Sequence, residues 1–454
     1  MENSTVSTAL PTFLVQVDAY FHRMAEELGH WVSTSPRTLA EIEEHTLAAV
    51  QTIGQQVLAG VCQVAAAAAP TPPTTPCACG QQADYQRQRP AQVRTVLGPI
   101  TIPRAYYHCP ACRHGLAPLD RQLGYCAGST SAGLDEVLAL LGATADSFEA
   151  ASTLLAKLTL VQISPNVVRA ATETLGQVLQ AEEQRVVQAA WARGALPSAV
   201  ATPPQLYISM DGVLVHTATQ WREYKLGSVY TTTLRPSTTQ PGRDDVCAQE
   251  ISSVGDLAEA ADFGQLLWCE AARRGVLTAR EVIVLADGAH WIWNLADEHF
   301  PGATQIVDWY HASHYLWQAA HAIYGEGTPL AKRWAKRRVA ELWAGQVPKV
   351  LRALGTAPQH AAVQEASTYY TYHQQRMAYA DYRARGLQIG SGTMESGCKQ
   401  IATARLKQAG MIWSVAGARA VAAVRTWLKS NRWTEAMTFR PLRQRTYHRL
   451  AALA

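Results

Sequence analysis

Three acidic residues, widely spaced in the 454-residue chain, have the chemistry to hold divalent metal ions together. Asp211 and Asp287 each precede a glycine, and each stands where an apolar run that predicts a strand stops. Glu395 lies at the start of a predicted helix that reaches about Gln408. Carboxylates at the ends of adjacent buried strands can bind a cation at the sheet edge, and two Mg²⁺ ions there could promote phosphodiester cleavage. Taken singly, each Asp-Gly pair is more typical of a turn, and Glu395 of a first helical turn.

Four cysteines form a second candidate metal site. Cys77 and Cys79 precede a predicted hairpin over 93–107, and Cys109 and Cys112 follow it. Thiolates bind Zn²⁺ tetrahedrally, and the ion would stabilise a β unit that has little core of its own. Because the first pair is C-x-C, buried reduced thiols stay an alternative, as does a redox C-x-x-C that lacks its usual βαβ setting. The other five cysteines have no partner spacing and are expected in the core: Cys62, Cys126, Cys247, Cys269 and Cys398.

Asp308-Trp-Tyr-His311 follows a further predicted strand, Thr304–Val307. An aspartate in this place is typical of the N-cap of the next helix, with His311 satisfied inside the fold. The alternative is a role for both side chains at a metal site. A metal pair of His311 with His314 is a weaker possibility.

Charge is distributed unevenly along the chain, although the net charge is only +4. From Arg383 to the end there are 13 Lys and Arg and two acids, Glu395 and Glu435, so this segment carries +11; the rest, with 27 basic and 34 acidic residues, carries −7. Such asymmetry indicates a polyanionic partner. Basic side chains would contact phosphates and indoles could stack on bases; the alternative is a solvated basic helix face with tryptophans in the core. The predicted DNA-contacting residues are Lys332, Arg333, Lys336, Arg337, Arg338, Lys399, Arg405, Lys407 and Trp413, with Trp427 and Trp433 as further stacking candidates.

The elements that must position these residues predict a multidomain α+β protein. Strands are expected at Leu206–Met210, Tyr224–Leu234, Val282–Ala286 and Thr304–Val307, with a helix near Leu257–Arg274. Thr38 and Glu41 predict a capping box at the start of a helix. The expected segments are a helical hairpin over 1–69 that could form a dimer interface, a proline-rich linker over 70–76, a zinc-ribbon-like unit over 77–126, a helical region over 127–196 with a candidate helix-turn-helix, a strand-containing domain over 205–433 that is helical over about 312–384, and a basic tail over 434–454.

Composition narrows the cellular setting. A hydrophobic share of 48% fits a globular protein. The first ten residues lack the basic and apolar runs of a signal peptide. Four glutamines in the long uncharged stretch after Thr46 disfavour a membrane span. We therefore expect a cytoplasmic, nucleoid-associated protein whose cysteines bind metal rather than form disulfides.

Several motifs together resemble the DDE transposases of bacterial insertion sequences, most of all the Kra-type group, with the Lre-type group and Mutator-like transposases as more distant relatives. The resemblance covers most of 77–433 and is most specific around Glu395. The similar stretches are Arg104-Ala-Tyr-Tyr-His-Cys109, Gly115-Leu-Ala-Pro-Leu-Asp120, Met210-Asp-Gly212, Leu285-Ala-Asp-Gly-Ala289, Val307-Asp-Trp-Tyr-His311, Gly390-Ser-Gly-Thr-Met-Glu-Ser396, Cys398-Lys399, Arg405-Leu-Lys407 and Gly410-Met-Ile-Trp413.

The resemblance implies a fold, an activity and partners. The fold would be an RNase H-like catalytic domain with a helical insertion. Asp211, Asp287 and Glu395 would ligate two Mg²⁺ or Mn²⁺ ions, with Asp308 and His311 supporting the site or positioning DNA. The partners would be double-stranded DNA, as transposon ends and target, and further copies of the chain, at least as a dimer. A DNA-binding protein without catalysis and an RNase H-like nuclease that cuts without joining are the alternative functions.

Overall fold

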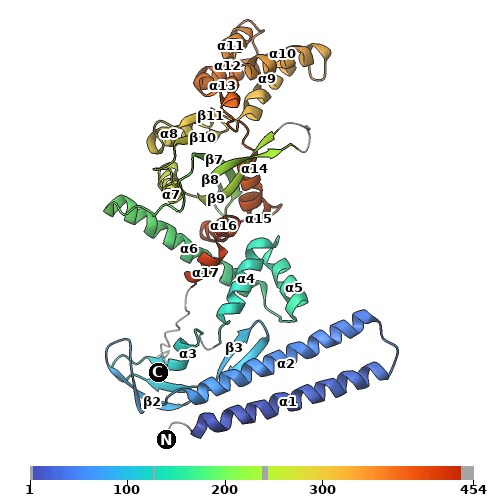
Figure 1. Cartoon of the computed structure of the whole chain (residues 1–454), viewed down its shortest axis with the longest axis vertical. Coiled ribbons are helices and arrows are strands. Elements are labelled where there is room, and N and C mark those ends of the chain that lie inside the picture. Colours follow the sequence, from blue (N-terminus) through green and yellow to red (C-terminus); the bar gives the residue numbers. More distant parts are fainter. Residues whose placement is uncertain (1–3, 126–127, 238–243, 441–454) are drawn as a thin grey trace. The chain divides into compact units, whose positions relative to one another are not determined.

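The chain divides into two compact units, which are described separately below. The computed structural model describes residues 4–125, 128–237 and 244–440. One unit comprises Met1–Leu175 with Arg440–Ala454, and the other comprises Gly176–Phe439. Helix α6 (Pro165–Arg193) contains the point at which the chain passes from the first unit to the second (Figure 1). Of the residues expected earlier, Cys126 and most of the basic tail, from 441 onward, lie outside the described ranges.

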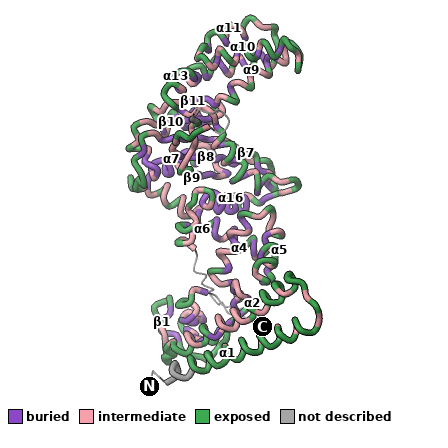
Figure 2. The backbone as a smooth tube through the Cα atoms, turned by 45° about the vertical axis from the view of Figure 1, so that its right-hand side comes forward, coloured by how far each residue is buried: buried purple, intermediate pink, exposed green. Residues whose placement is uncertain are grey.

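The first unit begins with two long antiparallel helices, α1 (Ser4–Ser33) and α2 (Leu39–Ala68). The predicted capping box is confirmed: the Thr38 N–H donates to the Glu41 carboxylate at 2.7 Å, and the Glu41 N–H donates to Thr38 Oγ1 at 3.3 Å. These bonds satisfy backbone donors that the first helical turn leaves free. The C-terminal part of α2 packs on a small β core that includes Val93 and Ile100. Most other positions of the hairpin are exposed (Figure 2).

A small β unit follows α2. Its four-stranded sheet has the order β1 (Thr74–Pro76), β2 (Gln82–Gln88), β5 (Ala105–His108) and β6 (Gly115–Leu116), and β3 (Ala91–Thr95) pairs with β4 (Gly98–Ile102). The linker prediction needs correction, because Thr74–Pro76 pairs with β2, so only 70–73 is unpaired. The hairpin prediction over 93–107 is also wrong in part. Thr95 pairs with Gly98, which places the turn at 96–97, and Ala105–His108 joins the other sheet.

The first unit is completed by the short helix α3 (Pro118–Gln122), by α4 (Ala132–Thr144) and α5 (Phe148–Thr159), and by the start of α6. Ser147 caps α5 by accepting the Ala150 N–H at 3.0 Å, and α6 begins at Pro165, as the Ser-Pro pair predicts. Leu138, Leu155 and Val168 bring α4, α5 and α6 into one buried cluster. The candidate helix-turn-helix therefore consists of two packed helices, α5 and α6.

The second unit is built on a five-stranded mixed sheet with the order β11-β10-β7-β8-β9. β7 (Gln205–His216), β8 (Trp221–Pro236) and β9 (Asp244–Asp256) are antiparallel, whereas β10 (Glu281–Ala286) runs parallel to both β7 and β11 (Thr304–Val307). Helices α7 (Ala260–Arg273) and α8 (His290–His299) pack against it. Figure 2 shows many buried residues in this sheet and in α16 (Val415–Lys429). Strand β9 was not predicted, because polar residues such as Gln249, Glu250 and Ser252 interrupt its apolar pattern.

The predicted all-helical segment is confirmed between β11 and the Glu395 region. It contains α9 (Trp309–Tyr324), α10 (Pro329–Trp343), α11 (Val347–Gly355), α12 (Ala361–His373), the 3₁₀ turn η1 (Gln374–Arg376) and α13 (Tyr379–Ala384), which gather beyond β11 in Figure 1. The chain ends its described part with α14 (Gly392–Gly397), a π-helical turn η2 (Cys398–Thr403), α15 (Ala404–Leu406), α16 (Val415–Lys429) and α17 (Trp433–Thr438). Within the described ranges, no helix has the length and apolar character needed to cross a bilayer.

The coarse fold prediction is confirmed. The chain is an α+β protein with N-terminal helices, a small four-cysteine β unit, and a mixed five-stranded sheet accompanied by helices.

Candidate functional site

Asp211 lies inside strand β7, so the prediction that the strand stops there is wrong. β7 continues to His216, with Asp211 opposite Leu226 and Gly212 opposite Lys225 on β8. A Cβ atom at Gly212 would lie 2.2 Å from the Glu223 carboxylate, so a larger residue there would displace that side chain. The Gly212 N–H donates to Asp211 Oδ1 at 2.6 Å, which orients the carboxylate.

Asp287 comes directly after β10, as predicted. β10 and β7 are parallel neighbours, and Val284 pairs with Ile208. Asp287 and Asp211 each come three residues later, so both strands deliver a carboxylate to the same region of the sheet. The Ala289 N–H donates to Asp287 Oδ1 at 3.1 Å, and the Tyr369 hydroxyl donates to the Asp287 carbonyl at 2.7 Å.

The carboxylates influence one another electrostatically. Burial, and then the negative charge of Asp287, raises the pKa of Asp211. Glu395 is exposed on α14, and its negative charge contributes, with that of Asp287, to raising the pKa of His311. Within the described ranges, however, only the four-cysteine group places three or more potential ligand atoms within 4.8 Å of one another. The three acids are therefore neighbours without the spacing of a closed ligand set.

Asp308 joins the strand end to the segment before Glu395. Its side chain is fully buried and caps α9: Oδ2 accepts the His311 N–H at 2.7 Å and lies 2.9 Å from His311 Nδ1. Oδ1 accepts the Ser391 N–H at 2.6 Å. Burial acts to raise the pKa of Asp308, but the hydrogen bonds from His311 and Ser391 outweigh burial and lower it. The side-chain hydrogen bond between Asp308 and His311 raises the pKa of His311. The N-cap interpretation is confirmed, and Asp308 also holds His311 and the start of the Glu395 helix in place.

Cys398 is a residue of this region that sequence reasoning placed only in the core. It is buried, as expected, but its thiol donates to Asp211 Oδ2 at 3.3 Å. Burial and the adjacent Asp211 raise its pKa, which keeps the thiol protonated as a donor. It also begins the π-helical turn η2, a deformation often found at functional sites. The sequence could have indicated that Cys398 lies near the carboxylates, because a residue three positions after Glu395 shares its helix face.

The four cysteines come together as predicted. Their Sγ atoms all lie within 4.8 Å of one another, with Cys77 and Cys112 at 3.5 Å and Cys79 and Cys109 at 3.7 Å. A tetrahedral site with Zn–S bonds of about 2.3 Å would have S···S separations of about 3.8 Å, so these sulfurs fit a zinc ion. The tight C-x-C arrangement is closed by a turn in which the Gly80 N–H donates to the Cys77 carbonyl at 3.0 Å. The cluster could therefore hold a structural zinc.

The predicted DNA-contacting residues separate into an exposed and a buried set. Arg338 is buried and paired with Glu341 at 2.7 Å, and Arg405 is 1% exposed with its guanidinium over the Trp413 ring. Trp413 is itself buried, and its backbone N–H donates to the His216 carbonyl at 3.0 Å. For these three the prediction of a direct DNA contact is wrong, since their side chains belong to the interior. The exposed set is Lys332, Arg333, Lys336 and Arg337 on α10, together with Lys399 and Lys407.

Trp427, a candidate stacking residue near the end of the chain, also lies against protein. Trp427 is 3% exposed, and its Nε1–H donates to Glu183 on α6 at 2.7 Å. Burial raises the pKa of Glu183 to about 7. Trp427 therefore anchors α16 to α6, which contradicts its prediction as a base-stacking residue and confirms the alternative of a core anchor.

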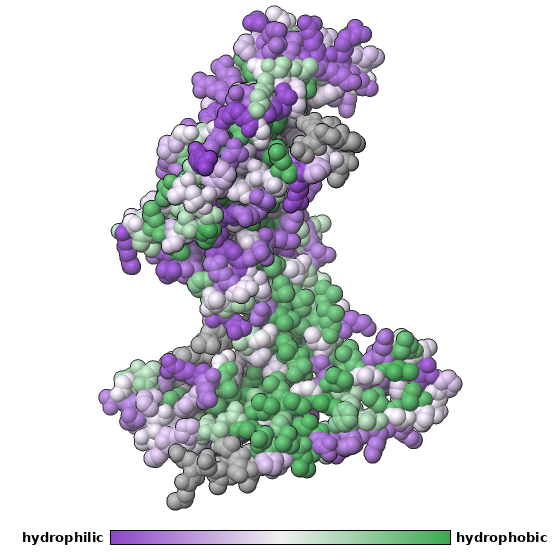
Figure 3. Space-filling model, viewed as in Figure 1, coloured by the Kyte–Doolittle hydropathy of each residue, from purple (hydrophilic) through white to green (hydrophobic). Residues whose placement is uncertain are grey.

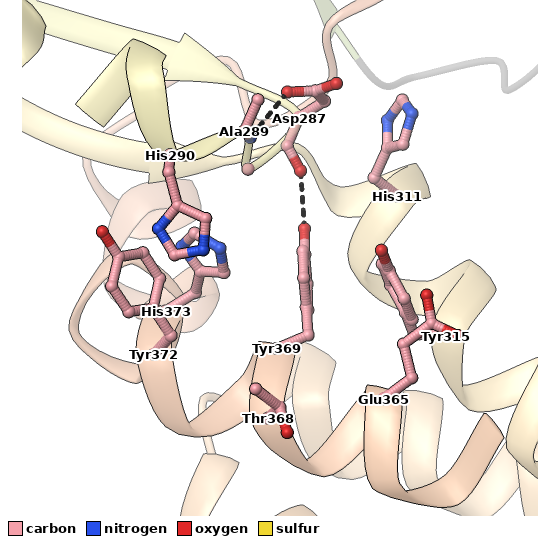
Figure 4. A pocket seen from close by; sticks show the side chains of 11 residues that line it. Asp287, Ala289, His290, His311, Tyr315, Glu365, Thr368, Tyr369, Tyr372 and His373 are labelled. Atoms are coloured by element: carbon pink, nitrogen blue, oxygen red, sulfur yellow. Dashed lines mark hydrogen bonds between the residues drawn. The ribbon is translucent and has the colours of Figure 1, made fainter. Parts of the chain in front are cut away.

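A cavity of about 540 Å³ lies beside Asp287, between the loop after β10 and helices α9 and α12 (Figure 4). The rings of Tyr315 and Tyr369 stack with their centroids 4.1 Å apart, and the centroids of the His290 and Tyr372 rings are 4.4 Å apart. The lining residues are Asp287, Gly288, Ala289, His290, His311, Tyr315, Glu365, Thr368, Tyr369, Tyr372 and His373. Sequence reasoning missed this cavity; the cluster Tyr369-Tyr-Thr-Tyr-His373 was the signal that could have indicated it.

Comparison of the chain with models of known protein families gave no match, and no curated protein matches it.

Proposed function

We propose that the chain is a DDE-type DNA transposase that hydrolyses phosphodiester bonds at transposon ends and transfers the 3′-OH to target DNA. The observation that carries the proposal is the meeting of Asp211 and Asp287, on adjacent strands, with Glu395 on α14. Besides burial, the charges of all three carboxylates raise the pKa of the Cys398 thiol, and those of Asp287 and Glu395 also raise the pKa of His311. On this proposal 205–433 is an RNase H-like domain. Support comes from the sheet of three antiparallel and two parallel strands and from the helices between β11 and α14.

Asp211, Asp287 and Glu395 would hold two Mg²⁺ or Mn²⁺ ions. Carboxylate oxygens suit these hard cations. Burial, and then the charge of Asp287, raises the pKa of Asp211, and a bound cation would stabilise its charged form. When bound, the metals would supply activation of the attacking oxygen and stabilisation of the leaving one. The chain itself fixes the ligands: the Gly212 N–H and Cys398 thiol orient Asp211, and Asp308 anchors the segment that carries Glu395.

Exposed basic residues supply the proposed DNA interface. Lys332, Arg333, Lys336 and Arg337 lie on α10, and Lys399 and Lys407 follow Glu395. Each phosphate neutralised by such a residue contributes to salt-dependent affinity. The packed pair α5 and α6 is a further candidate for DNA recognition.

The N-terminal hairpin is the proposed interface between copies of the chain. Figure 3 shows hydrophobic residues gathered over the part that contains α1 and α2. Among them, Leu14, Val15 and Phe21 on α1 and Leu39 and Val50 on α2 are each more than half exposed. Exposed apolar side chains in such numbers are typical of an association surface.

The test is Mg²⁺-dependent cleavage of DNA that carries the sequences flanking the gene. Asp211→Ala, Asp287→Ala and Glu395→Ala should each abolish nicking and end joining while DNA binding is retained. Asp262→Ala, at an exposed first-turn acid of α7, is the matched control and should cut like the wild type. Cleavage by all three site variants would refute the assignment.

One observation favours a second candidate function, a DNA-binding protein without catalysis. The three acids do not form a ligand group within 4.8 Å in the described part of the chain. Specific binding of the flanking DNA, with no nicking in Mg²⁺ or Mn²⁺, would support this alternative.

A further inference from the structure

The cavity beside Asp287 has the features of a site for a flat aromatic ligand. Its volume, about 540 Å³, falls within the usual range of ligand pockets. Figure 4 shows Tyr315, Tyr369, Tyr372 and the imidazoles of His290 and His373 around it. Tyr372 is 43% exposed, with the His290 ring 4.4 Å away between centroids and the Arg376 guanidinium 5.6 Å from its ring, so part of the ring surface is accessible to a ligand that enters.

The charged side chains in the lining favour a neutral group over a free anion inside the cavity. Its described lining includes the carboxylates Asp287 and Glu365 and contains no lysine or arginine. His373 lies in a desolvated position that lowers its pKa to about 4, so it carries no positive charge at neutral pH. The two carboxylates disfavour a free anion within the cavity, whereas a neutral ring can enter it.

One buried polar atom in the lining lacks a partner. His373 is only 2% exposed, and its Nδ1 has no hydrogen-bond partner among the described residues. A buried polar atom without a partner is costly, so a ligand with a complementary group would gain by binding here. Glu365, exposed at the cavity, adds a carboxylate acceptor, and carboxylates accept hydrogen bonds from the exocyclic amino groups of bases.

We propose that this cavity binds one unpaired nucleobase of the DNA substrate, stacked on Tyr372, and prefers bases that carry an exocyclic amino group. The inference deepens the proposed function, because the Tyr369 hydroxyl joins the cavity wall to the backbone of Asp287 at 2.7 Å. A base held here would place its own backbone beside the carboxylates. Such binding favours a nucleotide that is already unpaired, because extrusion from a duplex costs the energy of unstacking.

The experiment uses the full chain and a short single-stranded oligonucleotide that contains one 2-aminopurine. Stacking should quench the fluorescence of the probe. Because removal of one stacking ring weakens such binding considerably, Tyr372→Ala should reduce affinity roughly tenfold and abolish the quenching, whereas Tyr372→Phe should retain both. Tyr324→Ala, at a similarly exposed tyrosine on α9 away from the cavity, is the matched control and should behave like the wild type.

Base preference gives a second readout. The wild type should bind oligo-dC more tightly than oligo-dT, and Glu365→Gln should reduce that ratio. Equal affinities of Tyr372→Ala and Tyr324→Ala, or a probe that binds without quenching, would overturn the inference. If the chain nicks DNA but Tyr372→Ala has no effect, the inference fails and the proposed function stands. If probe binding depends on Tyr372 but no nicking occurs in Mg²⁺ or Mn²⁺, the cavity assignment stands and the catalytic proposal fails.

Discussion

The four-cysteine cluster and the three-carboxylate cluster are both candidate metal sites, but the chain assembles them differently. Cys77 and Cys112 are 35 positions apart, and short hydrogen-bonded turns bring their sulfurs to tetrahedral spacing. Asp211 and Cys398 are 187 positions apart and meet through the packing of a strand against a helix. Thiols tolerate one another at 3.5 Å, whereas carboxylates repel at that distance unless a cation or proton intervenes. The turns of the small β unit thus bring the four sulfurs to ligand spacing, whereas the packing of distant segments leaves the three carboxylates as an open site.

The largest effect expected from this comparison follows loss of a cysteine. Cys109→Ser should remove bound zinc and unfold the small β unit, because structural zinc contributes folding free energy of about 10 kcal/mol or more in small domains. The measurements are zinc content by metal analysis and circular dichroism with and without chelator. Cys247→Ser, at a half-buried cysteine on β9, is the control and should keep its zinc. Full zinc content in Cys109→Ser would contradict the assignment.

A smaller effect is expected at the buried carboxylate that supports the open site. Asp308→Ala leaves the Ser391 and His311 N–H groups without their acceptor. The free energy of unfolding should fall by about 2–5 kcal/mol, since each unsatisfied buried donor costs about 1–3 kcal/mol. Urea denaturation measures this change. Asp297→Ala, at an exposed aspartate on α8, should cost much less, and equal losses in the two variants would refute the supporting role.

The smallest effect concerns pH. The pKa of His311 is raised in the fold, so its stabilising contribution is present below the unfolded value of about 6.5 and is lost as pH rises through the folded value. The pKa of Asp308 is lowered, so its contribution is present above about 3.9 and is lost as pH falls through the folded value. The pair should therefore be most stable in mildly acidic solution.

Thermal denaturation from pH 5 to pH 9 tests the histidine's part. The wild type should lose stability relative to His311→Asn as pH rises above about 6.5. Because the His311 side chain is 45% exposed, the difference will be small. Parallel pH profiles for the two proteins would show that the ion pair does not contribute.

The sequence predicts features that depend on neighbouring residues. The Thr38 capping box, the Asp308 N-cap and each of the two cysteine pairs are set by short spacings. The pairing of β2 with β5 then brings the two cysteine pairs together. Features that depend on distant partners were missed. The continuation of β7 past Asp211 depends on its pairing with β8, and the polar strand β9 forms because it completes the sheet edge.

Side-chain roles show the same limit. The charge of Arg405 suggests a surface position, but Trp413 from a later segment covers it. The cavity beside Asp287 needs the loop after β10, α9 and α12 together, so no single stretch of sequence shows it. Spacing along the chain therefore indicates which groups are available, and tertiary packing determines which of them meet.

The central claim is that Asp211, Asp287 and Glu395 form one site for divalent ions. Electron paramagnetic resonance of Mn²⁺ titrated into the full chain, with and without the flanking DNA, tests it most directly. Asp211→Asn, Asp287→Asn and Glu395→Gln should each lower the affinity for Mn²⁺ at least tenfold, since each removes a charged oxygen ligand, while Asp262→Asn should bind like the wild type. Wild-type Mn²⁺ binding by the Glu395→Gln protein would contradict the claim.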